Sequence, residues 1–267
     1  MVQVWLVDLE RSAAPLEALE IETPRLSDDD QARIEALNHA TLRRQRRLTT
    51  IALRVLIAAH AGGPEFDRVP FHRLKGGKPV FQGARLSFSV AHSGQRALLA
   101  LGRDVPIGVD LEVLRTLHMP KDRQQALVRA ALVFGPLPPD EILAGKSDEE
   151  TLVLRSWVRL EALAKAHGCG IARVLAACGV LARGASAAED GPAFPANLGE
   201  SQDEHVLRVF DLALPQDAAG QPWFAALAVL GAPGEGGGGN SGQEVCTPEV
   251  RLLPTSRSGL VKVLAGA

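Results

Sequence analysis

Two carboxylates stand one residue apart in the segment IGVDLE, residues 107–112. Alternate residues of a strand point to the same side, so Asp110 and Glu112 share a face while Leu111 points to the core. Two like charges this close raise one pKa unless a positive charge lies nearby. A divalent cation supplies that charge, and oxygen ligands favour Mg²⁺, with Mn²⁺ as an alternative. An edge strand with a solvated polar face explains the pattern equally well without a metal.

A third carboxylate lies on a predicted helix in the segment WVRLEALAKAHG, residues 157–168. Trp157, Glu161 and Lys165 are spaced by four residues and therefore lie on one helix face. Glu161 is a candidate metal ligand and Lys165 a candidate partner for an anion. The alternative is an ordinary ion pair on an exposed helix, although a solvated stripe seldom needs a tryptophan.

Two short turns carry further polar candidates. In AHSG, His92 and Ser93 follow an apolar strand, and in GGKP, Lys78 follows two glycines. Glycine lets the backbone approach a ligand closely, and lysine is a point charge suited to phosphate. A hydrogen-bonded structural histidine and a basic surface turn are the plainer explanations. The G-x-S-x-G pattern of a hydrolase nucleophile is absent, so Ser93 is not expected to attack a substrate.

A basic cluster, LRRQRR at residues 42–47, precedes Arg54 on the same predicted helix. Its four arginines cannot all face the core. Such a cluster can bind the phosphates of a nucleotide or of nucleic acid. A solvated basic face is an equally good explanation for most of its members.

The elements that must position these residues follow from periodicity and from capping signals. A strand is expected at 2–10 and a helix at 26–62, with Ser27 as N-cap and Asp30 three residues later. Short strands at 86–94, 96–102 and 107–114 predict a small antiparallel sheet. Helices at 121–135 and 147–168 follow, and then strands at 205–214, 223–232 and 250–254. This order predicts an α+β fold of two similar halves, residues 1–115 and 116–267, each with a small antiparallel sheet packed on helices.

The composition narrows the function classes. The chain has 267 residues, 46% hydrophobic and 22% charged, with a formal net charge of -2. That balance is typical of a soluble protein and argues against one that coats nucleic acid. No apolar run reaches the length of a membrane span, and no signal peptide is recognised. Three cysteines at no metal-like spacing indicate a reduced, cytoplasmic protein. The Gly-rich segment 231–243 has no assigned role.

The order of these signals resembles the motif series of the 4′-phosphopantetheinyl transferases. The matching residues are GKP at 77–79, the HS turn at 92–93, G-x-D-x-E at 108–112, and then Trp157, Glu161, Lys165 and Gly168. The chain looks like the long, surfactin-synthetase-activating class, in which one polypeptide holds two similar halves. Ala91 stands where the family often has serine before the histidine, so one hydrogen bond is lost.

The resemblance implies a reaction and a site at the interface of the halves. The enzyme would transfer phosphopantetheine from coenzyme A to a serine of an apo acyl or peptidyl carrier protein, with Mg²⁺ as cofactor, as a monomer. Asp110, Glu112 and Glu161 would bind the metal, and Glu161 would also be the general base. Lys78, His92 and Lys165 would contact the coenzyme A phosphates, with Ser93 beside them. Some of the arginines at 43–54 would bind the 3′-phosphate, with Arg44 and Arg54 as the first candidates.

Two other function classes stay open on the sequence. One is a catalytically inactive relative that only binds coenzyme A or a carrier domain. The intact set of Asp110, Glu112, Glu161 and Lys165 argues against it, because binding alone does not require these residues. A nucleic-acid-binding protein would use the arginine helix, but the net charge and the lack of interleaved aromatic residues argue against it.

Overall fold

The computed structural model describes residues 2–61, 66, 68–81, 85–137, 148–181, 207–215, 222–231 and 247–266. Its elements are β1 (Val2–Asp8), α1 (Ala13–Glu22), α2 (Asp28–Glu35), α3 (Ala40–Ala61), β2 (His72–Arg73), β3 (Pro79–Val80), β4 (Leu86–Ser93), β5 (Arg96–Arg103), β6 (Ile107–Val113), α4 (Lys121–Leu132), α5 (Asp148–His167), α6 (Ile171–Ala177), β7 (Leu207–Asp211), β8 (Trp223–Leu230), β9 (Val250–Leu252) and α7 (Arg257–Leu264). The α+β class is thereby confirmed. None of the described helices is long and apolar enough to cross a membrane. Residues 232–243 of the Gly-rich segment, and Cys246, lie outside the described residues.

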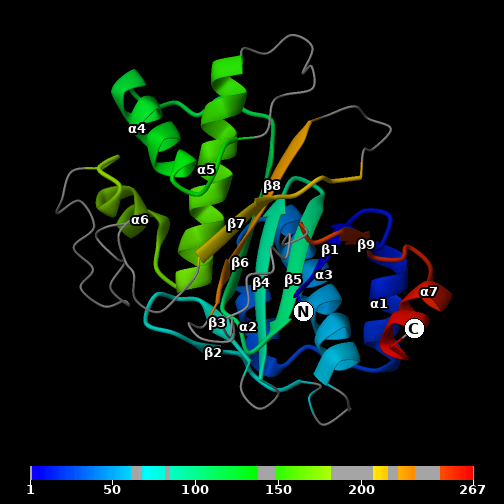
Figure 1. Ribbon diagram of the computed structural model, residues 1–267. Helices are drawn as coiled ribbons and strands as arrows, with labels where there is room; N and C mark the ends of the chain where they lie inside the picture. Colours follow the sequence, from blue (N-terminus) through cyan, green and yellow to red (C-terminus); the bar gives the residue numbers. More distant parts are fainter. Residues whose placement is uncertain are drawn as a thin grey trace.

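Two sheets form the centre of the protein (Figure 1). The first has the order β4-β5-β1-β9, in which β1 is antiparallel to β5 and parallel to β9. The second, β6-β8-β7, is antiparallel throughout. In Figure 1 the green helices α4, α5 and α6 lie on one side of the strands, and blue α1 and red α7 lie on the other.

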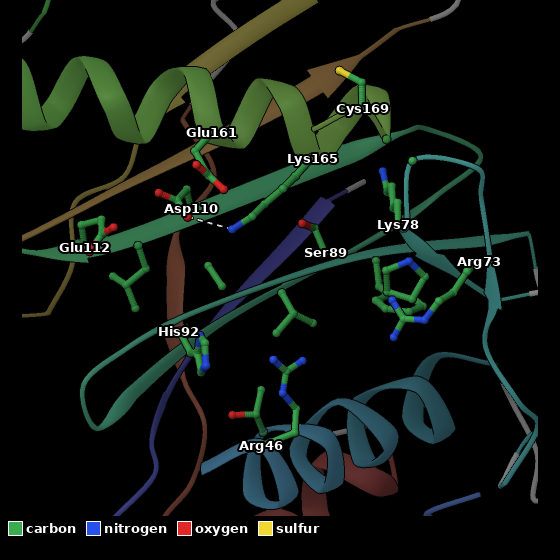
Figure 2. Close-up of a pocket in the computed structure, with 18 of the residues that line it drawn as sticks. Arg46, Arg73, Lys78, Ser89, His92, Asp110, Glu112, Glu161, Lys165 and Cys169 are labelled. Atoms are coloured by element: carbon green, nitrogen blue, oxygen red, sulfur yellow. Dashed lines mark hydrogen bonds and ion pairs between the residues drawn. The ribbon is translucent and has the colours of Figure 1, made fainter. Parts of the chain in front are cut away.

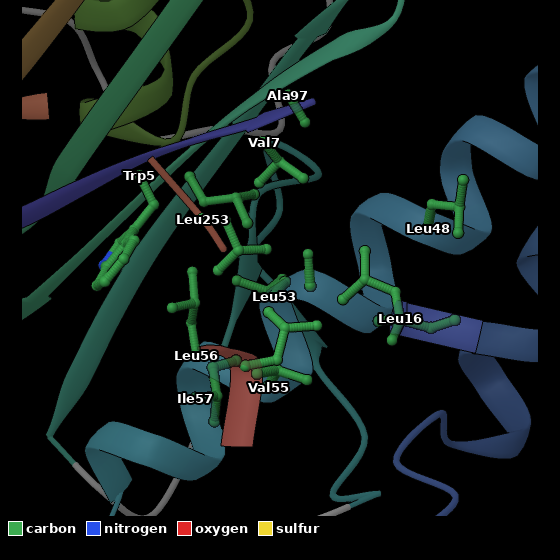
Figure 3. Packing of buried hydrophobic residues seen from close by; sticks show 14 of the residues in the cluster. Trp5, Val7, Leu16, Leu48, Leu53, Val55, Leu56, Ile57, Ala97 and Leu253 are labelled. Atoms are coloured by element: carbon green, nitrogen blue, oxygen red, sulfur yellow. The ribbon is translucent and has the colours of Figure 1, made fainter. Parts of the chain in front are cut away.

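Alternation along β1 and β5 divides the apolar residues between two cores. Trp5, Val7, Leu99 and their neighbours pack with α1, α3 and α7 (Figure 3). Val4, Leu6 and Leu98 point the other way, against Val109 and Leu111 of β6. A third core joins β8 to α4, α5 and α6. Because successive strand residues face opposite sides, the fold is a helix–sheet–sheet–helix stack.

Strand pairing crosses the boundary expected at residue 115. Strand β6 follows the β4–β5 hairpin in sequence but pairs with β8 of the second sheet. Conversely, β9 returns from the C-terminal end to pair with β1, and α7 packs against α1 and α3. Short strands in succession resemble one meander, and their sequence does not say where the pairing changes from one sheet to the other.

Most predicted elements are confirmed, and the differences have local causes. The helix expected over 26–62 is two helices, α2 and α3, with a break at residues 36–39. Its predicted start is confirmed, since Ser27 and Asp30 form a capping box. Helices α1, α6 and α7 were not predicted. They are short, and in α1 the Ser12 N-cap makes no side-chain hydrogen bond, so little in the sequence marks its beginning.

A buried ion pair fixes α3 against the start of α2. Arg54 is 1% exposed and Asp30 6% exposed. The Arg54 guanidinium donates to Asp30 Oδ2 from Nε at 2.9 Å and from Nη2 at 2.5 Å, and to the Val69 carbonyl at 2.6 Å. Its carbon Cζ lies 3.8 Å from the centre of the Phe71 ring. Arg54 therefore joins α3 to the start of α2 and to the segment of Val69 and Phe71 inside the core.

We predict that Asp30→Ala lowers the free energy of unfolding by about 3–5 kcal/mol, because the charge of Arg54 would stay buried without its main partner. Urea denaturation with matched m-values measures the change. The control is Asp29→Ala, which removes a neighbouring carboxylate that pairs with Arg33 on the exposed side of α2 and should matter little. Equal losses in the two variants would contradict the role assigned to the buried pair.

Candidate active site

The pocket that contains most of the candidate residues lies where the edges of the two sheets meet below α5 (Figure 2). It has a volume of about 600 Å³. Residues of α3, the turn around Gly76, β4, β6 and α5 line it, and its charged and titratable members are Arg46, Arg73, Lys78, His92, Asp110, Glu112, Glu161, Lys165 and Cys169. Seven of the nine residues named as site candidates from the sequence lie in or beside this pocket.

A close contact between β6 and α5 creates the acidic part of the pocket. Gly108 of β6 lies against the backbone of α5, where a Cβ atom would stand 2.0 Å from the Ala162 carbonyl oxygen. Only glycine permits this approach. The even-numbered residues of β6 then face α5, whereas Leu111 is buried between the sheets, as predicted. The glycine of the G-x-D-x-E motif is thus explained by packing.

Asp110 and Lys165 meet across this contact. Lys165 Nζ donates to Asp110 Oδ1 at 2.7 Å, and the Asp110 side chain is 8% exposed (Figure 2). The second oxygen, Oδ2, is buried without a hydrogen-bond partner. Burial raises the pKa of Asp110, and the ammonium of Lys165 opposes that rise. A buried oxygen without a partner is uncommon in proteins and marks a place where a ligand can bind.

The other two acids lie on either side of Asp110. Burial, and then repulsion from Asp110, raise the pKa of Glu161. Glu112 pairs with Arg115, whose Nη2 lies 2.6 Å from Oε1 and whose Nε lies 3.1 Å from Oε2. Among the described residues, no three or more His, Cys, Asp or Glu side chains are gathered closely enough to enclose a metal ion.

Side chains from the first half of the chain provide hydrogen-bond partners for the backbone amides at the free edge of β6. Ser89 Oγ accepts from the Val109 amide at 3.0 Å, and Ser93 Oγ accepts from the Val113 amide at 3.3 Å. Edge strands need such partners for their backbone groups. Ser93 therefore lies beside Glu112, with 3.4 Å between Oγ and Oε2, and helps to join the two sheets.

Lys78 also bridges the halves. Its ammonium donates to the carbonyls of Ile107 at 2.9 Å and Ala166 at 3.1 Å. Nearby, a Cβ atom on Gly76 would lie 1.8 Å from the Gly168 carbonyl oxygen, so the GGKP turn packs directly on the end of α5. Burial lowers the pKa of Lys78 to about 8. Gly76 of the predicted phosphate turn and Gly168 at the end of α5 thus make a direct backbone contact.

The opposite wall of the pocket is basic. Arg46 projects from α3 toward His92, and Arg73 lies near Lys78 (Figure 2). Burial and the positive charges of Arg46 and Lys165 lower the pKa of His92. Thr49, one turn after Arg46, has a buried hydroxyl without a hydrogen-bond partner.

Two arginines expected at the site lie elsewhere. Arg54 is buried against Asp30, and Arg44 lines a separate groove with Arg43 and Arg47. Arg46 and Arg73 line the pocket instead, and no sequence pattern distinguishes them from the other arginines. Four arginines within six positions point in several directions on a helix, so only the packing of α3 shows which one faces the pocket.

We predict that the lowered pKa of Lys78 makes stability rise with pH. Between about pH 8 and the ordinary value of 10.5, the unfolded chain binds more protons at this lysine than the folded chain does. The unfolding free energy of the wild type, minus that of Lys78→Met, should therefore increase by up to about 1.4 kcal/mol per pH unit. Taking the difference removes the opposing titration of the cysteines. A difference independent of pH would contradict the burial of this charge.

No protein-family model matches the chain. Among known proteins, HetI of Nostoc sp., a 4′-phosphopantetheinyl transferase, is 30% identical over 180 residues, which are 65% of this chain and 71% of HetI. The protein slr0495 of Synechocystis sp. is 30% identical over 178 residues, 63% of this chain and 65% of that protein. The 4′-phosphopantetheinyl transferase AcpT of Salmonella typhimurium is 34% identical over 94 residues, 34% of this chain and 46% of AcpT. The similarity to HetI, which covers more than two thirds of that protein, shows that the chain belongs to the 4′-phosphopantetheinyl transferase family.

Proposed function

We propose that this protein transfers the 4′-phosphopantetheine group from coenzyme A to a serine of an apo carrier protein and releases 3′,5′-ADP. The observation that carries the proposal is the division of charge in the pocket. Asp110, Glu112 and Glu161 lie along β6 and α5. The positive charge of Arg46 lies opposite on α3, with the imidazole of His92 from β4 beside it as a hydrogen-bonding group. Coenzyme A has a pyrophosphate and a separate 3′-phosphate, so one molecule can bring its pyrophosphate to the first group while its 3′-phosphate meets the second.

The acidic side suits Mg²⁺ or Mn²⁺ by its chemistry. Carboxylates are hard oxygen ligands, and Asp110 Oδ2 is a buried oxygen without a partner. The three acids do not form a closed cage. Mg²⁺ usually binds through one or two carboxylates together with the phosphates of its substrate, so an open arrangement fits an ion that is shared with coenzyme A. Asp110, Glu112 and Glu161 would hold it. When bound, the ion would neutralise the pyrophosphate and stabilise the charge on the leaving oxygen.

The residues of this chain supply the remaining steps. Lys165, next to Asp110, would bind the pyrophosphate and stabilise its developing charge. The serine Oγ of the carrier attacks the β-phosphorus, a new P–O bond forms, and the bond to the bridging oxygen of 3′,5′-ADP breaks. Glu161 accepts the serine proton.

The assignment to the long, surfactin-synthetase-activating class belongs to the same proposal. Both parts of the chain contribute to the pocket: Arg46, Lys78 and His92 come before β6, and Glu161 and Lys165 come after it. A chain with both parts needs no second copy to complete the site, which supports a monomer. A cytoplasmic location is part of the same proposal. The arrangement as two similar halves stays a prediction, because the two sheets differ in strand number and order.

The reaction is tested with purified protein, coenzyme A, Mg²⁺ and apo carrier proteins from fatty acid, polyketide and nonribosomal peptide synthesis, with mass spectrometry as the readout. We expect the phosphopantetheine mass on at least one carrier. We expect Glu161→Gln to reduce transfer by at least about 100-fold, as loss of a general base does, while coenzyme A binding weakens much less. No modified carrier from the wild type would contradict the activity and favour a relative that only binds coenzyme A or a carrier domain.

Two neighbouring arginines provide a matched test of how coenzyme A is oriented. Arg46 faces the pocket, and Arg44 lines the separate groove two residues away. Arg46→Ala should weaken coenzyme A binding about tenfold, the effect of losing one charge-assisted hydrogen bond, and Arg44→Ala should leave it within twofold. Isothermal titration calorimetry measures both. If the Arg44 variant lost more affinity, the placement of the 3′-phosphate beside Arg46 would be wrong.

A further inference from the structure

Glu112 differs from the other two acids because both of its oxygens already have partners. Arg115 lies 2.6 Å from Oε1 through Nη2 and 3.1 Å from Oε2 through Nε, which is a two-pronged pair. Ser93 Oγ also approaches Oε2, at 3.4 Å. Asp110, by contrast, keeps one buried oxygen without a partner.

Arg115 is placed so that it can leave this carboxylate. It stands three residues after Glu112, beyond the end of β6, and its side chain is 44% exposed, against 18% for Glu112. Its position at the surface lets water screen the attraction, so a stronger partner can separate the pair. Planar guanidinium groups bind phosphate as well as they bind carboxylate.

We propose that Arg115 competes with the divalent cation for Glu112, so that the cation binds well only together with coenzyme A. The proposal rests on the function proposed above. Without substrate, Arg115 occupies Glu112 and leaves the cation a poorer site. The pyrophosphate gives the guanidinium another anionic partner and gives the cation further oxygen ligands. Cation and coenzyme A therefore increase each other's affinity, and that increase is reciprocal.

The consequence is an enzyme that does not hold a metal ion tightly between turnovers. Lys165 also competes with the cation, by pairing with Asp110. It is the less suitable residue for a test, because it is also expected to bind substrate. Arg115 can be replaced without loss of the buried contacts of the site, because its ion pair with Glu112 lies at the surface.

The experiment is a titration of the protein with Mn²⁺, followed by electron paramagnetic resonance of the free ion, with and without coenzyme A and without any carrier protein. Arg115→Met should bind Mn²⁺ about fivefold more tightly than the wild type when coenzyme A is absent, the effect expected from removing one exposed ion pair. Coenzyme A should then raise the Mn²⁺ affinity of this variant by a smaller factor than that of the wild type. Arg115→Lys, which keeps the charge but not the two-pronged geometry, should lie between them.

The control is Arg123→Met, which removes an exposed arginine from α4 and should not change either affinity. Equal Mn²⁺ affinities of the wild type and Arg115→Met without coenzyme A would overturn the proposed competition and leave the transferase function standing. If the wild type bound no Mn²⁺ with or without coenzyme A, the metal site itself, and this inference with it, would be wrong.

Discussion

The site depends on one contact, the direct packing of strand β6 on helix α5 at Gly108. Since no side chain separates the two backbones there, Asp110 lies within hydrogen-bonding distance of Lys165, and Glu161 faces the same space. Any larger residue at position 108 would push the helix away and separate these groups. The acids and the ammonium are therefore held by main-chain packing between two regular elements, which is a more rigid support than a loop provides.

A second constraint follows from the position of β6 at the edge of its sheet. Its outward backbone groups need partners, and Ser89, Ser93 and Lys78 from the first half of the chain provide them. The residues that join the two sheets thus also line the pocket or border it. For this reason Ser93 and Lys78 have a structural role alongside any contact with substrate. The glycines at 76 and 108 have a structural explanation of their own, the close approach of two backbones.

The sequence predicted the acidic side of the pocket better than the basic side. Alternation in a strand and a four-residue spacing in a helix determine which faces Asp110, Glu112, Glu161 and Lys165 share, because those periods are set by local geometry. The pocket arginines depend on tertiary packing. Arg54 follows the arginine cluster on the same helix and was therefore a site candidate. It is instead buried against Asp30, a partner 24 residues away that no local pattern identifies. The change of sheet between β5 and β6, and the return of β9 to β1, were equally beyond reach, since pairing between distant strands leaves little trace in either strand.

The charges of the pocket connect its structure to its proposed chemistry. Asp110 has Lys165 and Glu112 has Arg115, so the chain itself supplies cations where a metal ion would bind. The central claim is that coenzyme A and a divalent cation replace these pairings in one pocket between the sheets. The most direct measurement is a crystal structure of the protein with coenzyme A and Mg²⁺. We predict the pyrophosphate beside Asp110 and Lys165 and the 3′-phosphate beside Arg46 and His92; coenzyme A bound instead in the groove of Arg43, Arg44 and Arg47 would contradict the account.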